Sequence, residues 1–189
     1  MENNKDKYHK FITPTGIARF PWLTKADTKF NPDGIYKTDL LLSSEDAKAI
    51  ATELKDLFKK HHPKAKGKFP WAKDVSEDGK ETGNIIFKFK TKNKPALFDA
   101  KGKPIQNTNV YGGSQIKVSA TAAPYSAAGN VGITLYLNAV QVIELVTGDS
   151  GGQQSFGFVA TDGYEHSSEV EEAFNTDETS TATDDDDEF

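Results

Sequence analysis

Cysteine is absent from the 189-residue sequence, which excludes a disulfide framework and any metal site built on thiolates. The sequence therefore gives no support to an oxidising compartment, and a reducing cytosol fits it best. Long apolar runs are also absent. The first ten residues are polar and lack the apolar core of a signal peptide, and no later segment is apolar enough to span a bilayer. We expect an intracellular protein that does not cross a membrane.

Signatures of catalysis and of metal binding are sparse. The sequence has no phosphate-binding Gly-Lys-Ser/Thr loop, and its four histidines lack the spacing of metal ligands. The acidic run Asp184–Glu188 could bind divalent cations loosely, but a flexible run of carboxylates lacks the rigid geometry of a catalytic two-metal site. We expect a protein that is not an enzyme and that holds no metal ion and no cofactor.

Positive charge is missing from the last part of the chain. All 23 Lys and Arg residues lie between Lys5 and Lys117, and residues 1–147 also contain 15 acidic residues, so this part has a net charge of +8. Residues 148–189 contain 13 acidic residues and no Lys or Arg, which gives a net charge of −13. A basic body followed by an acidic tail is the main feature of the sequence, and the overall charge of −5 conceals it.

Apolar and alternating segments predict about five strands. The expected strands are 35–42, 84–92, 114–122 and 131–146, with a short hairpin at 96–105. Residues 10–23 are a first extended segment, which Pro14 and Pro21 place at the edge of the sheet or divide into short strands. The clearest strand alternates apolar and basic residues, with Phe87 and Phe89 facing one side and the neighbouring lysines the other. In the last strand the apolar phase slips between Leu137 and Val142, which predicts a β-bulge or a sharp bend.

One helix and two loops are expected between these strands. Apolar residues recur at helical spacing over 44–62, after Ser43 or Ser44 as the capping residue and before a proline. Residues 63–83 and 125–132 show no sustained period, so we expect both to be loops.

The fold class follows from the order of these elements. Five strands with one interposed helix and no βαβ rhythm favour a small closed or nearly closed barrel, for which an OB-fold is the natural candidate. We expect a mainly β domain over residues 1–147. Residues 148–189 are Gly-rich, polar and acidic, and they contain too few apolar residues to offset the entropy of the chain. We expect them to be a flexible linker and a disordered tail ending in Phe189.

A row of lysines follows the clearest strand. Lys88 and Lys90 alternate with phenylalanine, and Lys92 and Lys94 extend the same run. A half-buried strand with solvated lysines would show the same alternation. Sites for single-stranded DNA, however, combine a positive groove with aromatic platforms that contribute roughly 1–3 kcal/mol per stacked base. The lysine row therefore points to nucleic-acid binding when aromatic residues lie beside it.

Five aromatic residues fall outside the predicted inward phase: Trp22, Trp71, Tyr111, Tyr125 and Tyr136. We favour Tyr125, because it lies among Pro, Ser, Ala and Gly residues in a predicted loop, where burial would be hard to arrange. Trp22 and Tyr111 are further candidates. The tripeptide Phe-Pro-Trp occurs at 20–22 and again at 69–71, but two short matches do not establish an internal repeat.

The acidic tail has a distinctive end. The residues are Asp184, Asp185, Asp186, Asp187, Glu188 and Phe189. A ring beside a carboxylate suits a small apolar pocket rimmed by basic residues on a partner, and the preceding acids would steer the encounter. Because the tail and the body carry opposite charges, we also expect the tail to compete with DNA for the basic groove.

Several short motifs follow one another along the chain. They are Asn31-Pro32-x-Gly34-x-Tyr36-Lys37-x-Asp39-Leu40, Phe87-Lys88-Phe89-Lys90, Gly112-Gly113-Ser114-x-Ile116-Lys117-Val118, Pro124-Tyr125, Val-Gln-Val-Ile-Glu-Leu and the acidic end that closes on Phe189. Each motif alone is weak. In this order and spacing, over most of the body, the sequence resembles the single-stranded-DNA-binding proteins of short-tailed, T-seven-like bacteriophages.

The resemblance implies an OB-fold that binds single-stranded DNA during replication and recombination, anneals complementary strands and often forms a homodimer. It also implies a tail that contacts the phage DNA polymerase and primase-helicase in the cytoplasm of an infected bacterial host. By position, it implies that Tyr125 stacks on bases and that Lys29, Lys88 and Lys90 contact the DNA backbone. The chain departs from the family pattern in a shorter segment after the helix and a shorter tail.

Two other functions remain open beside the leading one, which is sequence-tolerant binding that protects and anneals single-stranded DNA. An RNA-binding OB-fold protein would have a similar groove, and nothing in the sequence identifies a residue that reads the 2′-hydroxyl. An acidic-tailed interaction protein or chaperone that binds no DNA would be expected to have an acidic body, whereas residues 1–147 are basic.

Overall fold

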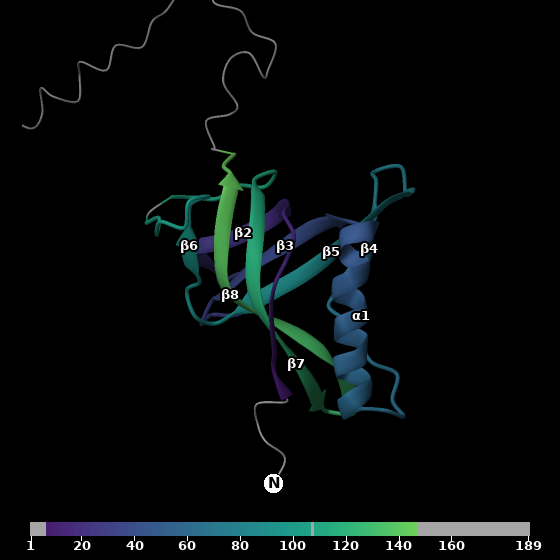
Figure 1. Cartoon of the computed structure of the whole chain (residues 1–189). Coiled ribbons are helices and arrows are strands. Elements are labelled where there is room, and N and C mark those ends of the chain that lie inside the picture. The colour runs from purple at the N-terminus through teal and green to yellow at the C-terminus, as the bar shows by residue number, and fades with distance from the viewer. Residues whose placement is uncertain (1–6, 107, 147–189) are drawn as a thin grey trace, which may run out of the picture. The chain divides into compact units, whose positions relative to one another are not determined.

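The structure, a computed structural model, describes residues 7–106 and 108–146 (Figure 1). This part of the chain contains one helix and eight strands, which makes it mainly β, as the sequence predicts. The elements are β1 (His9–Ile12), β2 (Gly16–Asp27), β3 (Ile35–Ser43), α1 (Ser44–His61), β4 (Trp71–Val75), β5 (Glu81–Thr91), β6 (Ala96–Phe98), β7 (Gln115–Ala127) and β8 (Asn130–Glu144). Within the described residues, no helix is both long and apolar enough to cross a membrane.

Five of the strands pair in a closed circuit. β2 pairs with β3, β3 with β5, β5 with β8, β8 with β7, and β7 pairs again with β2. Two joints of this circuit are short, because β2 meets β7 only at Gly16 and Ile17, and β5 meets β8 in parallel only at Lys90 and Tyr136. β1, β4 and β6 pair outside the circuit. The sheet follows the predicted OB-type fold without being a clean barrel.

The strands of the circuit enclose an apolar core. Phe87 and Phe89 are almost completely buried, and the lysines between and after them are exposed, so the predicted alternation is confirmed. At the joint between β2 and β7, a Cβ atom on Gly16 would lie 2.6 Å from the carbonyl oxygen of Leu41. Backbones approach this closely only where the residue has no side chain, so Gly16 closes the sheet at this point.

The helix begins as the sequence predicts. Ser43 is the N-cap residue: its Oγ accepts a hydrogen bond from the backbone N–H of Asp46 at 3.1 Å. Ala47, Ile50, Leu54 and Phe58 form the buried face of the helix and pack against the sheet. The last turn carries Lys59, Lys60 and His61, which complements the negative end of the helix dipole. In Figure 1, α1 lies along one side of the strands.

The predicted bulge lies in β8. Ser119 of β7 pairs with Ala139, and the next residue, Ala120, pairs with Leu137, which leaves Asn138 as an extra residue. The side-chain amide of Asn138 donates a hydrogen bond to Thr121 Oγ1 at 2.9 Å. The bulge prediction is confirmed, and its position between Leu137 and Val142 agrees with the slip in the apolar pattern.

The prediction that residues 63–83 form a loop is wrong in part. This segment contains β4 and the start of β5, which pair as a hairpin joined by a turn in which Gly79 has a φ of 77°. Three of the five residues of β4 are exposed, so the strand shows no apolar alternation that the sequence could reveal.

The prediction that residues 125–132 form a loop is also wrong. β7 extends to Ala127 and β8 begins at Asn130, so the connection is a two-residue turn of Ala128 and Gly129. Both residues have positive φ, as a tight hairpin turn between right-twisted strands requires. Pro124 lies within β7, where its pairing with β1 has already ended at Ala122.

Candidate nucleic-acid interface

A row of residues crosses the outer face of the sheet from β2 to β8. The strand register places Trp22 opposite Lys37, Lys37 opposite Lys90, and Lys90 opposite Tyr136. Residues that are paired across strands project on the same face of a sheet. Two lysines therefore lie between two exposed rings, of which Trp22 is 41% exposed and Tyr136 is 45% exposed.

A second row runs beside the first. Here Arg19 pairs with Asp39, and Asp39 pairs with Lys88. Burial raises the pKa of the Asp39 carboxyl above its ordinary value, against the opposing effect of Lys88, Lys37 and Arg19. Asp39 is therefore a half-buried acid surrounded by cations.

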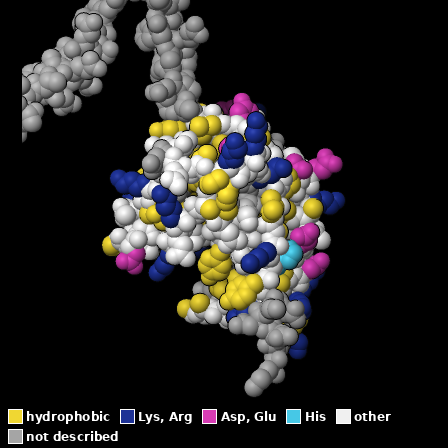
Figure 2. Space-filling model, turned by 60° about the vertical axis from the view of Figure 1, so that its left-hand side comes forward, with side chains coloured by type: hydrophobic (Ala, Val, Ile, Leu, Met, Phe, Trp, Pro, Cys, Tyr) yellow, Lys and Arg dark blue, Asp and Glu magenta, His cyan; other side chains and the backbone are white. Residues whose placement is uncertain are grey.

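A groove with a volume of about 810 Å³ includes Lys37, Lys90 and Tyr136 of the first row and Asp39 and Lys88 of the second. Four of its lining residues are basic: Lys37, Lys68, Lys88 and Lys90. Asp39 is the one acidic residue among the described residues that line it. The balance of charge is positive, so the groove attracts a polyanion. Figure 2 shows a face of the molecule on which Lys and Arg side chains are interspersed with hydrophobic ones.

The groove also presents aromatic rings. Phe20, Tyr125 and Tyr136 line it, and Phe20 is 73% exposed. Every nucleic-acid base has a face on which an aromatic ring can stack, so rings in a positive groove bind single strands with little regard to sequence. The arrangement of rings and lysines matches what such a site requires.

One wall of the groove is a short segment between α1 and β4. The backbone N–H of Lys68 donates to the carbonyl oxygen of Val131 at 2.9 Å, and that of Ile133 donates to the carbonyl oxygen of Lys68 at 3.0 Å. On the other side, the backbone N–H of Lys88 donates to the carbonyl oxygen of Pro70 at 2.8 Å. The segment thus bridges β8 and β5, which pair with each other at a single position.

Aromatic packing holds this wall in place. Phe69 stacks on Trp71 with 4.5 Å between ring centroids, and it meets Phe58 of α1 edge-on at 5.4 Å. Trp71 in turn contacts the buried Phe87 at 5.5 Å. Such pairs add to the stabilisation that comes from burial alone. The wall is therefore fixed to the core, and Lys68 is presented from a defined position.

Tyr125 lines the groove, but the prediction that it lies in a loop that prevents its burial is wrong. Tyr125 lies in β7 opposite Gly132, and its side chain is half-buried. It is accessible because it faces the groove, and not because a loop prevents its burial.

Phe20 reaches the groove from a bulge in β2. Arg19 pairs with Asp39 and Trp22 pairs with Lys37, so Phe20 and Pro21 together face the single residue Thr38 on β3. Phe20 has a φ of 47°, in the left-handed region that is costly for a residue with a side chain. The bulge turns the ring out of the core and into the groove.

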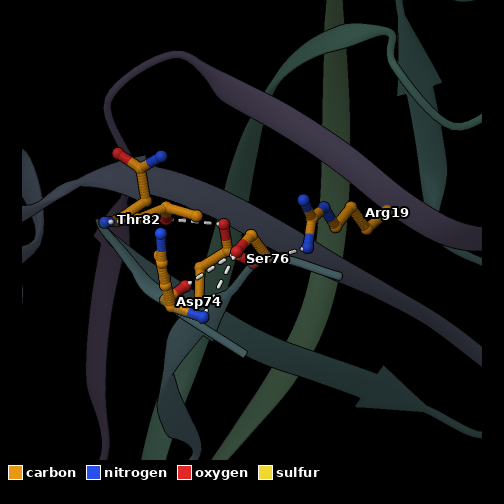
Figure 3. Close-up of polar contacts among 6 residues, drawn as sticks. Arg19, Asp74, Ser76 and Thr82 are labelled. Carbon is orange, nitrogen blue, oxygen red and sulfur yellow. Dashed lines mark hydrogen bonds and ion pairs between the residues drawn. The ribbon is translucent and has the colours of Figure 1, made fainter. Parts of the chain in front are cut away.

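An ion pair anchors β2 directly before this bulge (Figure 3). Arg19 Nη1 donates to Asp74 Oδ1 at 2.6 Å, and Thr82 Oγ1 donates to Asp74 Oδ2 at 2.7 Å. The hydrogen bond from Thr82 is the largest effect that holds the pKa of Asp74 below its ordinary value, and Arg19 adds to it against the opposing effect of burial. The contacts tie β2 to the β4–β5 hairpin.

The other predicted residues lie away from the groove. Trp22 and Tyr111 line a second depression of about 220 Å³. Lys29, Lys92 and Lys94 are exposed and line neither of these two depressions. Lys29 lies over the ring of Phe30, with its Nζ 5.4 Å from the ring centroid. The predicted residues that the groove brings together are thus Lys88, Lys90 and Tyr125.

Several groove residues were not predicted from the sequence. They are Phe20, Lys37, Asp39, Lys68, Phe69 and Pro70. The repeated tripeptide Phe-Pro-Trp was a signal for Phe20, Phe69 and Pro70 alone, because the Phe residues of both copies line the groove. Among the described residues, no three His, Asp or Glu side chains gather as a metal site. The tail residues Asp184, Asp185, Asp186, Asp187, Glu188 and Phe189 lie outside the described residues.

Comparison with known proteins identifies the family. The profile of the family described as the ssDNA-binding protein of Enterobacter phage Enc34 matches residues 18–174 of the chain. The chain belongs to this family. It is also 28% identical over 197 residues to the single-stranded DNA-binding protein of Enterobacteria phage T3, a match that covers 84% of this chain and 85% of that protein.

Solved structures of phage single-stranded-DNA-binding proteins share the fold. The crystal structure of gp2.5 of bacteriophage T7 has a TM-score of 0.61 at 24% identity and covers 85% of this chain and 100% of that one. The bacteriophage Enc34 protein in complex with ssDNA has a TM-score of 0.59 at 15% identity and covers 74% of this chain and 88% of that one. The mainly β, single-helix fold is thus that of this family.

Proposed function

We propose that the chain binds single-stranded DNA in the groove, without strong preference for sequence. Tyr125 and Tyr136 provide faces on which bases stack. Backbone phosphates are neutralised by the four lysines of the groove, Lys37, Lys68, Lys88 and Lys90. Such binding is a cycle of capture and release and needs no catalytic step, metal ion or cofactor.

One observation carries this proposal: a single groove of about 810 Å³ contains four lysines and the exposed or half-exposed rings of Phe20, Tyr125 and Tyr136. Phosphate contacts give affinity without sequence information, whereas stacking requires bases that are free of a duplex. A groove built only for a folded partner protein would not need both. Membership of the phage family supports the same function.

A competition experiment tests the class of nucleic acid. Labelled oligo-dT is bound by the full chain and displaced with unlabelled oligo-dT or with oligo-U of equal length. Half-displacement at a lower concentration of oligo-dT would support the DNA assignment. Equal displacement by oligo-U would contradict it, and stronger displacement by oligo-U would favour an RNA-binding protein of the same fold.

The biological role that we infer is protection and annealing of single strands during phage DNA replication and recombination, in the cytoplasm of an infected bacterium. Residues 1–147 act as the DNA-binding domain and residues 148–189 as a linker and tail. The protein functions as a homodimer, and its tail recruits the phage DNA polymerase and primase-helicase. Analytical ultracentrifugation at micromolar concentration tests the homodimer, and a monomeric mass would contradict it.

The tail also competes with DNA for the groove. Its net charge of −13 is opposite to the +8 of residues 1–147. A tail tethered by a flexible linker has an effective concentration on the order of millimolar, which lowers the affinity for DNA without abolishing it. Deletion of residues 165–189 should therefore tighten DNA binding at low salt, and the gain should fade as salt rises. Unchanged affinity at low salt would contradict this competition.

The end of the tail recruits partners independently of this competition. Removal of Phe189 alone should leave DNA affinity unchanged, because the acids Asp184, Asp185, Asp186, Asp187 and Glu188 remain. The chain without Phe189 should bind the phage polymerase more weakly than the full chain does in a pull-down. Retained polymerase binding by the shortened chain would show that the ring does not contribute.

A further inference from the structure

Phe20 combines two features that protein folding alone does not favour. Its ring is 73% exposed although it is apolar, and its backbone has a φ of 47° although it has a side chain. Exposure forfeits the stabilisation of a buried ring, and the left-handed backbone adds a further cost. A position that is strained and exposed in this way persists only where the surrounding structure determines it, and it is commonly a functional one.

The surroundings of Phe20 determine its conformation from both sides. Before it, Ala18 accepts a hydrogen bond from the N–H of Gly113 and donates its own N–H to Ser114, both at 2.9 Å. Arg19 is held by Asp74. After it, the register of the sheet resumes at Trp22. The backbone on either side is fixed, so the bulge has little freedom to relax.

A turn does not explain the conformation of Phe20. Among the described residues, only Phe20 and Ala128 are non-glycine residues with positive φ. Ala128 belongs to the two-residue turn between β7 and β8, which requires positive φ. Phe20 lies within β2, where the bulge serves to direct its ring into the groove beside Tyr125 and Tyr136.

We propose that Phe20 is a stacking wedge that makes the groove selective for single strands. This inference rests on the proposed binding of single-stranded DNA. The rigidly held ring stacks on one base and interrupts the stack between that base and its neighbour. A single strand accepts this interruption readily, whereas a duplex would have to unstack and kink at that step. Phe20 thus contributes affinity for single strands and little affinity for duplex DNA.

Phe20→Gly tests the proposal, because glycine removes the ring and also adopts positive φ without strain. The matched control is Ala128→Gly, which relieves the same kind of strain outside the groove. Three ligands of equal length are compared by fluorescence anisotropy: oligo-dT, an abasic oligomer with the same phosphates, and duplex DNA. Thermal unfolding is followed in parallel, and Phe20→Tyr serves as the conservative variant.

The proposal predicts that Phe20→Gly weakens binding of oligo-dT by about 5- to 150-fold, the range expected for one stacked base. Binding of the abasic oligomer and of duplex should be unchanged. The melting temperature should be equal to that of the unaltered protein or higher, and Phe20→Tyr should bind oligo-dT normally. Ala128→Gly should change the affinity for none of the three ligands.

Three results would overturn the proposal. If Phe20→Gly bound oligo-dT as tightly as the unaltered protein, the ring would have no role in binding. If it lost affinity for the abasic oligomer to the same extent, Phe20 would shape the groove without touching bases. If it lost affinity only together with a lower melting temperature, Phe20 would be structural. Absence of oligo-dT binding by the unaltered protein would instead refute the proposed function itself.

Discussion

The ring of Tyr125 rests on Gly132, its partner in the pairing of β7 with β8. A Cβ atom on Gly132 would lie 2.9 Å from both Cε1 and Oη of Tyr125 and 2.3 Å from the carbonyl oxygen of Lys68. The absence of a side chain at this position therefore permits two features of the groove, the orientation of Tyr125 and the close approach of the wall that presents Lys68.

Gly132→Ala should consequently damage the groove. The side chain of Tyr125 can move away from the added methyl group. The carbonyl oxygen of Lys68 cannot, because the backbone of Lys68 is hydrogen-bonded to both Val131 and Ile133 of β8. We expect weaker binding of oligo-dT, by roughly tenfold or more if stacking on one base is abolished, and a lower melting temperature. Gly112→Ala is the control, since the nearest atom to a Cβ there is 3.9 Å away. Normal binding by Gly132→Ala would show that the wall adapts.

Tyr136 provides the cleaner test of base stacking. The ring of Tyr136 is 45% exposed, so Tyr136→Ala should weaken binding of oligo-dT by roughly 1–3 kcal/mol and leave the melting temperature unchanged.

Tyr125→Ala should weaken binding to a similar extent, with some decrease in stability because the ring of Tyr125 packs on Gly132. The corresponding Phe variants should bind nearly normally. Anisotropy titrations and thermal unfolding would check this, and full affinity of Tyr136→Ala would exclude its ring from the site.

The lysines of the groove should govern the salt dependence. Replacing Lys88 and Lys90 with glutamine should weaken binding and reduce the slope of log affinity against log salt by about 0.7 for each phosphate that is no longer neutralised. The matched variant replaces Lys92 and Lys94, which carry the same charge on the same run but lie outside the groove. If replacing Lys92 and Lys94 reduced the salt slope more than replacing Lys88 and Lys90, the DNA would instead bind the surface beside the groove.

Asp39 should make DNA binding sensitive to pH. Burial raises the pKa of its carboxyl, and phosphates brought close to it would raise the pKa further, so binding takes up a proton. Affinity for oligo-dT should therefore fall as pH rises through this raised pKa. Asp39→Asn should bind more tightly at pH 7.5, by roughly two- to tenfold, with a flatter pH profile. Above the pKa of Asp39, the charged and half-buried carboxyl lowers the folding stability of the unaltered protein. The melting temperature of Asp39→Asn should therefore be no lower than that of the unaltered protein. Identical pH profiles would contradict this role.

The elements that alternate or repeat regularly were predictable from the sequence. Phe87 and Phe89 point inward with exposed lysines between and after them, because a strand with one buried face has a period of two. Ser43 caps α1, since a serine before an acidic first turn and an apolar stripe determines a helix start. The bulge at Asn138 was visible as a slip in the apolar phase.

The rest of the candidate site depends on contacts between distant segments, which leave little trace in the local sequence. The wall that presents Lys68 exists because β5 and β8 diverge and the backbone of residues 68–70 fills the space between them. Phe20 looks like one more core residue of an apolar segment, and only the register shift between Arg19 and Trp22 turns it outward. The spacing of apolar residues along the sequence predicts neither the wall of residues 68–70 nor the outward position of the Phe20 ring.

We propose that the groove selects single strands through aromatic stacking in a positive field. The most direct test of this proposal is the affinity of the full chain for single-stranded and duplex DNA of equal length over a series of salt concentrations. We expect tighter binding of the single strand at every salt concentration, and a log–log slope of about 0.7 per neutralised phosphate for that strand. Equal affinity for both forms, or an affinity for single strands that does not change with salt, would contradict it.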